Sequence, residues 1–142
     1  MNSIFILNLF SSFFLCGLIW TVQIVHYPYF IFTDSEQHQQ AMDFHRTRIS
    51  FIVIPAMLAE LLSSAWLTFT ATEFIWLHTA GFIIVLLIWV ITFAKQVPLH
   101  SNLANQFSRT DINNLVKSNR WRTILWTLKS LTGILILKEY LI

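Results

Sequence analysis

The sequence predicts an all-α fold, a membrane-embedded four-helix bundle that forms a single domain over residues 1–142. Composition is the first reason: 56% of the residues are hydrophobic and 11% are charged, against about 45–50% and about 25% in soluble domains. Clustering is the second reason, because the apolar residues form four runs close to the roughly 20 residues that a helix needs to span a bilayer.

Each apolar run predicts one membrane-spanning helix. The four spans are expected from about Ser3 to Val25, Ile49 to Phe69, Phe74 to Ala94 and Trp121 to Leu141. The first span lacks a basic leading segment and exceeds the ~7–15 apolar residues of a signal peptide, so we expect it to stay in the protein. Pro55 lies inside the second span and is expected to kink it without ending it, since membrane helices tolerate proline.

The connections between the spans differ in length. A tight turn around Thr70 to Glu73 joins the second and third spans, whereas the other two connections are long and polar. Each long connection contains a segment typical of a capping box, which favours the start of an amphipathic helix. These segments are Thr33-Asp34-Ser35-Glu36 and Ser108-Arg109-Thr110-Asp111. We expect His38 to lie on the solvated face of the first of these helices.

The distribution of basic residues predicts the orientation. Four crossings put both termini on one side of the membrane and both long connections on the other. Lys138 lies on the terminal side. The long-connection side carries Arg46, Arg48, Lys95, Arg109, Lys117, Arg120 and Arg122. By the positive-inside rule, both termini face away from the cytoplasm, in what we expect to be a bacterial inner membrane.

A shift of 74 residues aligns polar residues of the two halves and suggests two repeated helical hairpins. At this shift His26 coincides with His100, Arg46 with Arg120, and Arg48 with Arg122. The first and third spans cross in the same direction, so an axis along the membrane normal would relate the halves. The alternative is that two helical hairpins share hydropathy without duplication. In both cases, His and Arg residues gather at one membrane face.

Two charged residues lie inside the predicted spans, where burial is costly and asks for a partner or a purpose. Glu60 lies in the second span and Lys129 in the fourth, at comparable depths. A buried ion pair between them is the simpler prediction and would fix how the two helices pack. A proton-carrying or metal-binding Glu60 is the alternative. Cys16 is the only cysteine and is expected to be a small buried hydrophobe.

Three histidines near the long-connection face are candidates for catalysis or metal binding. His26 ends the first span, His45 precedes the second and His100 follows the third. Three imidazoles from three elements could bind a transition metal, although none of their spacings matches a diagnostic motif. The competing interpretation is that they hydrogen-bond to backbone or lipid headgroups. His78 lies toward the opposite face without a histidine partner at its depth, which disfavours a bis-histidine haem.

Polar and aromatic residues recur at three- to four-residue spacing along three of the spans, which predicts a polar pocket. If these stripes face one another, the pocket suits a flat, hydrophobic and partly anionic molecule. The candidate pocket residues are Gln23, Tyr27, Trp89, Gln96, Asn119 and Trp126, together with Arg122. The alternative is interfacial anchoring, with arginines on lipid phosphates and tryptophans in an aromatic belt.

Two segments of the second half carry a resemblance to a known family. The segments are Gln96-Val97-Pro98-Leu99-His100-Ser101-Asn102-Leu103-Ala104 and Asn119-Arg120-Trp121-Arg122-Thr123. They are similar to the Val-Pro-Leu/Ile-Asn-Asn-x-Leu and Trp/Asn-x-x-Arg-Thr segments of the anthrone oxygenase-like family of small four-helix membrane proteins, with His100 in place of the family's asparagine. The resemblance implies a four-helix fold and, from the named members, oxidation of aromatic polyketides without a known cofactor. It assigns roles to the matching residues Pro98, His100, Asn102, Asn119, Arg120 and Arg122.

The leading functional hypothesis is a membrane enzyme that oxidises or isomerises a lipophilic aromatic or quinone-like substrate. His26, His45 or His100 would act as general base near neutral pH, and Arg120 or Arg122 would stabilise negative charge on an oxygen. The cofactor is either none or a transition metal bound by the three histidines.

The alternative functions are a non-catalytic protein that binds lipid or a protein partner and a histidine metal-binding protein. The expected partners are membrane lipids and a lipophilic small molecule, while a homo-oligomer stays open. A net charge of +2 is too small to favour nucleic acid.

Overall fold

The computed structural model describes residues 3–33 and 35–141, and every regular element in these ranges is a helix. The elements in chain order are α1 (Ser3–Thr21), the π-helix η1 (Val22–His26), α2 (Tyr27–Tyr29), the 3-10 helix η2 (Phe30–Phe32), α3 (Ser35–Thr70), α4 (Ile75–Ile91), the π-helix η3 (Thr92–Gln96), α5 (Val97–Asn105) and α6 (Arg109–Leu141). The capping box predicted around Asp34 lies outside the described residues, together with the side chains of Ser35 and Glu36. The one predicted at Ser108 is present, since its hydroxyl accepts the backbone N–H of Asp111 at 3.1 Å.

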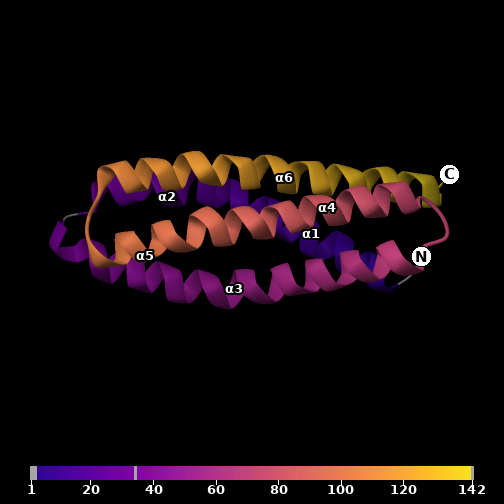
Figure 1. Cartoon of the computed structure of the whole chain (residues 1–142), viewed down its shortest axis with the longest axis horizontal. Coiled ribbons are helices and arrows are strands. Elements are labelled where there is room, and N and C mark those ends of the chain that lie inside the picture. The colour runs from indigo at the N-terminus through magenta and orange to yellow at the C-terminus, as the bar shows by residue number, and fades with distance from the viewer. Residues whose placement is uncertain (1–2, 34, 142) are drawn as a thin grey trace.

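The predicted all-α four-helix bundle is confirmed. The long helices α1, α3, α4 and α6 run side by side along the molecule (Figure 1). The ends of the described chain and the α3–α4 turn lie at one end of the bundle, which we call the terminal end. The α2 and α5 helices and both long connections lie at the other end, which we call the polar end. Both α3 and α6 exceed the predicted spans, because each amphipathic segment continues without a break into the apolar helix that follows.

The tight turn predicted around Thr70 to Glu73 is also observed. The α3 helix ends at Thr70 and α4 begins at Ile75, and Phe74 between them has a left-handed backbone with φ of 53°. The carbonyl of Phe74 accepts the N–H groups of Leu77 and His78 and so closes the first turn of α4. The chain therefore reverses direction within the segment 71–74.

Two π-helices interrupt the bundle helices, each ending two residues before a proline. The N–H groups of Tyr27 and Val97, which follow η1 and η3, donate to the carbonyls five residues earlier instead of four. The next residues are Pro28 and Pro98. A proline donates no backbone hydrogen bond and its ring crowds the preceding turn, so the wider π turn accommodates it.

The structure contains a repeat of elements but corrects its predicted alignment. The order helix, π-helix, short helix and long helix occurs twice along the described chain. The π-helices begin 70 residues apart (92 − 22), so His26 corresponds to Gln96, and the predicted match of His26 with His100 is wrong. The α3 and α6 helices begin 74 residues apart (109 − 35), because the second half has the longer connecting helix α5.

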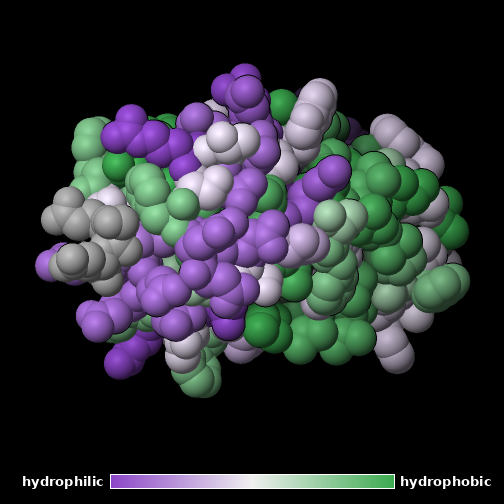
Figure 2. All heavy atoms as spheres, turned by 60° about the vertical axis from the view of Figure 1, so that its left-hand side comes forward, coloured by the Kyte–Doolittle hydropathy of each residue, from purple (hydrophilic) through white to green (hydrophobic). Residues whose placement is uncertain are grey.

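The bundle is apolar outside and partly polar inside. Large hydrophobic side chains are exposed along all four long helices, among them Phe10, Leu62, Val90 and Leu135. Figure 2 shows hydrophilic atoms gathered over the polar end and hydrophobic atoms covering the remainder of the visible face. A soluble helix bundle has the reverse distribution, with polar residues on its outer face.

Three helical segments, Ser3–Phe32, Gln37–Thr70 and Ile75–Asn105, are long and apolar enough to cross a membrane, which suggests a membrane protein. The α6 helix is not among them, so the prediction of four spanning runs holds for three. The reason lies in its charges: Arg122 and Lys129 face the interior of the bundle, while Ile124 and Leu128 lie on its exposed face. From outside, residues 121–137 of α6 therefore present an apolar surface like that of the neighbouring helices, whereas Lys117, Arg120 and Lys138 are exposed beyond them.

Two apolar clusters form the core, with a polar layer between them. The larger cluster includes Leu15, Met57 and Trp126, and the smaller one at the terminal end includes Phe5 and Leu67. Between them along the helices lie the buried polar residues Asn8, Ser12, Glu60, Ser63, Ser64 and Lys129. The cavity described next lies on the polar-end side of this layer.

Candidate functional site

A cavity of about 580 Å³ lies between the helices in the polar half of the bundle. This volume is within the range of small-molecule sites, about 300–1,000 Å³. Most of the wall is aliphatic or aromatic and comes from all four long helices. The polar members of the lining are Tyr27, Arg46, Ser50, Thr92, Gln96, His100, Ser101 and Arg122.

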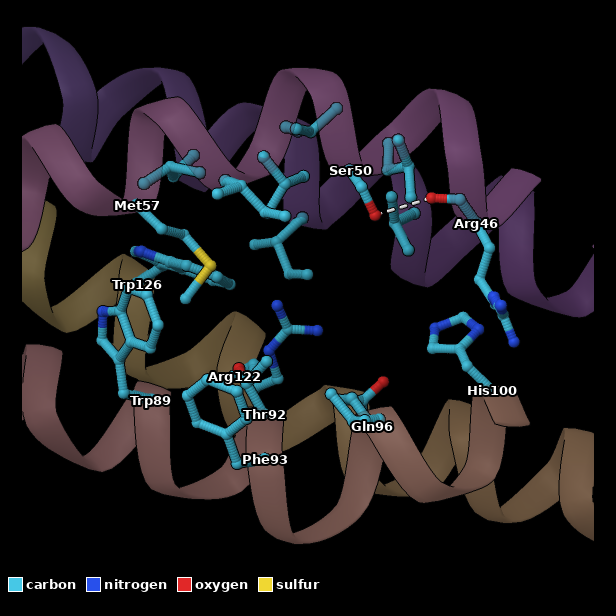
Figure 3. A pocket seen from close by; sticks show the side chains of 18 of the residues that line it. Arg46, Ser50, Met57, Trp89, Thr92, Phe93, Gln96, His100, Arg122 and Trp126 are labelled. Carbon is cyan, nitrogen blue, oxygen red and sulfur yellow. Dashed lines mark hydrogen bonds between the residues drawn. The ribbon is translucent and has the colours of Figure 1, made fainter. Parts of the chain in front are cut away.

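The cavity is polar at one end and apolar at the other. Met57, Trp89 and Trp126 gather at the apolar end, whereas Arg46 and His100 lie at the polar end (Figure 3). The guanidinium of Arg122 projects into the space between the two groups. This arrangement suits an elongated molecule with a flat apolar part and a polar edge.

The cavity opens sideways toward the apolar surface of the bundle. Three apolar lining residues are at least half exposed, Ile54 on α3, Phe93 on η3 and Val97 at the start of α5, and the polar lining residues Arg46 on α3 and Ser101 on α5 are exposed as well. Because these residues belong both to the lining and to the outer surface, the opening lies between α3 and the η3–α5 segment.

Arg122 is held in place by a chain of amide groups. Its Nη1 donates to Asn119 Oδ1 at 3.0 Å, and Asn119 Nδ2 donates to Gln23 Oε1 at 2.9 Å. The guanidinium also lies 4.9 Å from the ring centroid of Trp126 and is only 5% exposed. Gln23 and Asn119, both predicted to line the pocket, instead lie behind Arg122 and fix its position.

Tyr27 and His100 form a hydrogen-bonded pair at the polar end of the cavity. The Tyr27 hydroxyl lies 2.9 Å from His100 Nε2 and 3.4 Å from Gln96 Oε1. Gln96 in turn donates to Ser118 Oγ at 2.8 Å. The π turn η1 ends directly before Tyr27, and Tyr27 is buried in the cavity wall. The pair can exchange a proton with a ligand oxygen, since both groups donate and accept hydrogen bonds.

The three candidate histidines come together, although only His100 lines the cavity. The ring centroids of His26 and His45 are 4.4 Å apart, and those of His45 and His100 are 5.6 Å apart. His45 is buried and its Nε2 has no hydrogen-bond partner, whereas His26 is exposed. Within residues 3–33 and 35–141, no three His, Cys, Asp or Glu side chains are arranged to hold a metal ion. The His26 and His45 rings are tilted by 34°, and the His45 and His100 rings are stacked with an interplanar angle of 28°.

Two further residues assigned by sequence lie away from the cavity. Arg120 is exposed on α6, on a different face from Arg122, and Asn102 is exposed on α5. Both are therefore poor candidates for contact with a ligand in this cavity. In contrast, Tyr27, Trp89, Gln96, His100, Arg122 and Trp126 all belong to the lining, as the stripes and the segment resemblance suggested.

Arg46 is a lining residue that the sequence pointed to as a topology signal and a member of the repeat, but not as part of the pocket. It begins a stripe on α3 that continues through Ser50, Val53 and Met57 at three- to four-residue spacing. The Ser50 hydroxyl donates to the backbone carbonyl of Arg46 at 2.6 Å (Figure 3). The same periodicity rule that selected the other three stripes would have found this one.

The predicted ion pair between Glu60 and Lys129 is wrong, although both side chains are buried, at 1% and 4% exposure. Lys129 Nζ donates instead to Asn8 Oδ1 at 2.8 Å, and Glu60 Oε2 accepts the indole N–H of Trp126 at 2.9 Å. Asn8 Nδ2 donates to the hydroxyls of two α3 serines, both at 2.8 Å. The side-chain amide of Asn8, on α1, thus separates the charges of Glu60 and Lys129. Trp126 lines the apolar end of the cavity and connects it to this polar layer through its hydrogen bond to Glu60.

The expectation that His38 is solvated is also wrong. Its side chain is fully buried, its Nδ1 lies 2.9 Å from Thr33 Oγ1, and its ring packs edge-on against Phe107. The start of α3 lies against the α5–α6 connection, which buries the face that the sequence assigned to solvent. His38 therefore has a structural explanation.

The fold and the site together define a class of protein: an all-α bundle with three helices apolar enough to cross a membrane and a side-opening cavity that holds one buried arginine. No protein-family model, curated protein or solved structure matches the chain. The function is therefore argued from the residues of the cavity.

Proposed function

We propose that the protein is an integral membrane enzyme that binds a flat, lipophilic, monoanionic aromatic or quinone-like molecule and oxidises it. The observation that carries this proposal is the position of Arg122. Its guanidinium projects into a mostly apolar cavity and forms no ion pair with any acidic residue that the structure describes. An arginine fork holds a carboxylate, phenolate or enolate oxygen well, and the aromatic floor suits a flat ring.

The charges inside the bundle support a ligand with one negative charge. Arg122 and Lys129 are buried cations, and Glu60 is the buried acid among the described residues. If all three are charged, the interior carries one uncompensated positive charge, which is costly in an apolar environment. A monoanionic ligand beside Arg122 would balance this charge, whereas a neutral ligand would not.

The residues of the cavity then have distinct roles in the proposed reaction. Arg122 holds the oxygen of a hydroquinone-type substrate that is bound as its monoanion, and the His100–Tyr27 pair accepts the proton of the remaining hydroxyl. The monoanion gives two electrons to dioxygen, which dissolves in the lipid phase and, with two protons, leaves as hydrogen peroxide, while the substrate leaves as the quinone. The resemblance to the anthrone oxygenase-like family points to the same class of reaction.

The location and orientation belong to the same proposal. The cavity opens toward the apolar surface of the bundle, so a substrate dissolved in the membrane reaches it directly. The basic residues at the polar end favour a cytoplasmic position for that end, with both termini on the opposite side of a bacterial inner membrane.

The proposal is tested with a coloured probe of the proposed class, a 2-hydroxy-3-alkyl-1,4-naphthoquinone, and its neutral methyl ether. We expect the detergent-purified protein to bind the anionic probe more tightly than the ether. Arg122→Gln should weaken binding of the anionic probe by roughly 10- to 100-fold, the value of one charged hydrogen bond. The matched control is Arg120→Gln, which removes an exposed arginine two residues away and should leave the affinity unchanged.

Equal affinity of the wild type and Arg122→Gln for the anionic probe would contradict the proposal. Consumption of dioxygen with the reduced probe separates the enzyme from the second candidate, a non-catalytic carrier of lipophilic acids. The sideways opening and the largely apolar wall favour that candidate equally well. Tight binding without dioxygen consumption would therefore move the assignment to the carrier.

A further inference from the structure

A second hollow lies on the outside of the bundle, where η3 and α5 meet α6. It is an open groove of about 720 Å³. Its polar lining consists of Lys95, Asn114, Lys117 and Ser118, and its apolar lining includes Ile91 and Trp121. The groove is separate from the cavity, and none of its lining residues belongs to the cavity wall.

The groove is positively charged without an internal counterion. Lys95 and Lys117 both line it, no acidic side chain does, and neither lysine forms an ion pair with a residue that the structure describes. Two cations that share a groove repel each other, and an anion between them would remove this repulsion. The Asn114 amide adds a neutral donor, whereas the Ser118 hydroxyl already donates to the backbone carbonyl of Asn114 at 2.8 Å. This set of donors matches the oxygens of a phosphate group.

The π-helix η3 explains why these groups meet. Lys95 and Gln96 are its last two residues; Lys95 is exposed in the groove, whereas Gln96 is buried in the cavity wall. Gln96 Nε2 donates to Ser118 Oγ at 2.8 Å, so one hydrogen bond joins the wall of the cavity to the lining of the groove. A group bound in the groove would thus be connected to the Tyr27 hydroxyl through Ser118 and Gln96.

The surroundings of the groove favour a phosphate that belongs to a lipid over a free phosphate ion. Trp121 is 63% exposed at its edge, and the exposed apolar faces of α4 and α6 continue from there along the bundle. A tryptophan at this position is typical of the boundary between headgroups and acyl chains. A phosphate held by the lysines could therefore carry acyl chains that lie along these faces. A free phosphate ion would make no use of that apolar surface.

We propose that this groove binds the headgroup of an anionic phospholipid. The inference rests on the proposed membrane location, but not on the ligand or the reaction proposed for the cavity. Basic pockets between membrane helices are known to bind acidic headgroups in this way.

Native mass spectrometry of the full chain in detergent tests the proposal. Phosphatidylglycerol and phosphatidylcholine with the same acyl chains are titrated separately, and we expect phosphatidylglycerol to bind more tightly. In the double variant Lys95→Gln/Lys117→Gln, the ratio of the affinities for phosphatidylglycerol and phosphatidylcholine should fall roughly 30-fold, at about 1 kcal/mol for each lysine. The control variant Arg109→Gln/Lys138→Gln removes two exposed positive charges outside the groove and should keep the preference.

Three results would overturn the proposal. The first is equal binding of the two lipids by the wild type, and the second is an equal loss of preference in the control variant. The third is displacement of phosphatidylglycerol by equimolar inorganic phosphate, which would assign the groove to a free anion. If alkaline carbonate extracted the protein from cell membranes, the membrane location itself would be refuted. Loss of naphthoquinone binding concerns the cavity alone. Failure of the lipid proposal can therefore be told apart from failure of the proposed function.

Discussion

Replacing Lys129 tests the polar layer that separates the two apolar clusters. The ammonium of Lys129 is buried, its partner is the Asn8 amide oxygen, and its aliphatic stem lies against Gly81. Lys129→Met keeps the length of that stem and removes the charge and the hydrogen bond. The carboxyl of Glu60 is then left in the layer without a compensating cation among the described residues.

The size of the effect follows from the contacts. Leaving one charge of a buried pair uncompensated costs about 3–5 kcal/mol. Because Glu60 and Lys129 do not touch, and Glu60 keeps its bond from the Trp126 indole, we expect about 3 kcal/mol for Lys129→Met. In Glu60→Gln/Lys129→Met both charges are gone. The remaining cost is about 1 kcal/mol for the lost hydrogen bond to Asn8.

The free energies of unfolding are measured on the purified variants in mixed micelles of a mild detergent and dodecyl sulfate. Loss of the helical circular dichroism signal reports the unfolding. The single variant should be less stable than the double variant by about 2 kcal/mol, the difference between these two costs. If the effects of the two substitutions simply add, the charges do not interact across Asn8. The electrostatic explanation of the layer would then be wrong.

Two further predictions concern helix packing and the support of Arg122. Gly133→Ala places a Cβ 2.7 Å from Leu9 Cδ2, the movable end of a partly buried side chain, so it should be less stable than Gly17→Ala by about 1 kcal/mol in the same unfolding assay, whereas Gly17→Ala has open space and should be neutral or stabilising by up to ~1 kcal/mol. Equal effects at the two glycines would refute the close approach of α1 and α6. Gln23→Ala removes the outer amide of the chain behind Arg122 and should weaken binding of the anionic naphthoquinone by less than Arg122→Gln does, about 3- to 10-fold. An unchanged affinity in a titration of that variant would show that Asn119 alone fixes the guanidinium.

The sequence was sufficient for the helices and for much of the cavity, because both depend on periodicity. Arg122, Trp126, Trp89 and Gln96 were selected by three- to four-residue spacing, and all four line the cavity. Periodicity identifies a face of a helix but not what that face meets. Asn119 shares the stripe of Arg122, yet it lies behind the guanidinium and supports it.

The errors arise where a neighbouring helix decides the outcome. Glu60 and Lys129 are at matched depth, but Asn8 on a third helix takes the ammonium, and depth alone could not show this. The sequence alone predicted a solvated His38, but in the structure Phe107 of the α5–α6 connection packs against its ring. The connecting helix α5 is longer than its counterpart in the first half, so a constant offset of 74 could not align both the π-helices and the long helices that follow them.

The polar inner face of α6 has a consequence for biogenesis. In a membrane, α6 is the segment least suited to leave the translocon alone, because Arg122 and Lys129 make its partition into lipid unfavourable. The groups that receive these cations lie on segments synthesised earlier: Asn8 on α1 receives Lys129, and Gln23 on η1 supports Arg122 through Asn119. The last helix would thus enter a bilayer that already contains its hydrogen-bonding partners, so its insertion and its docking become one event.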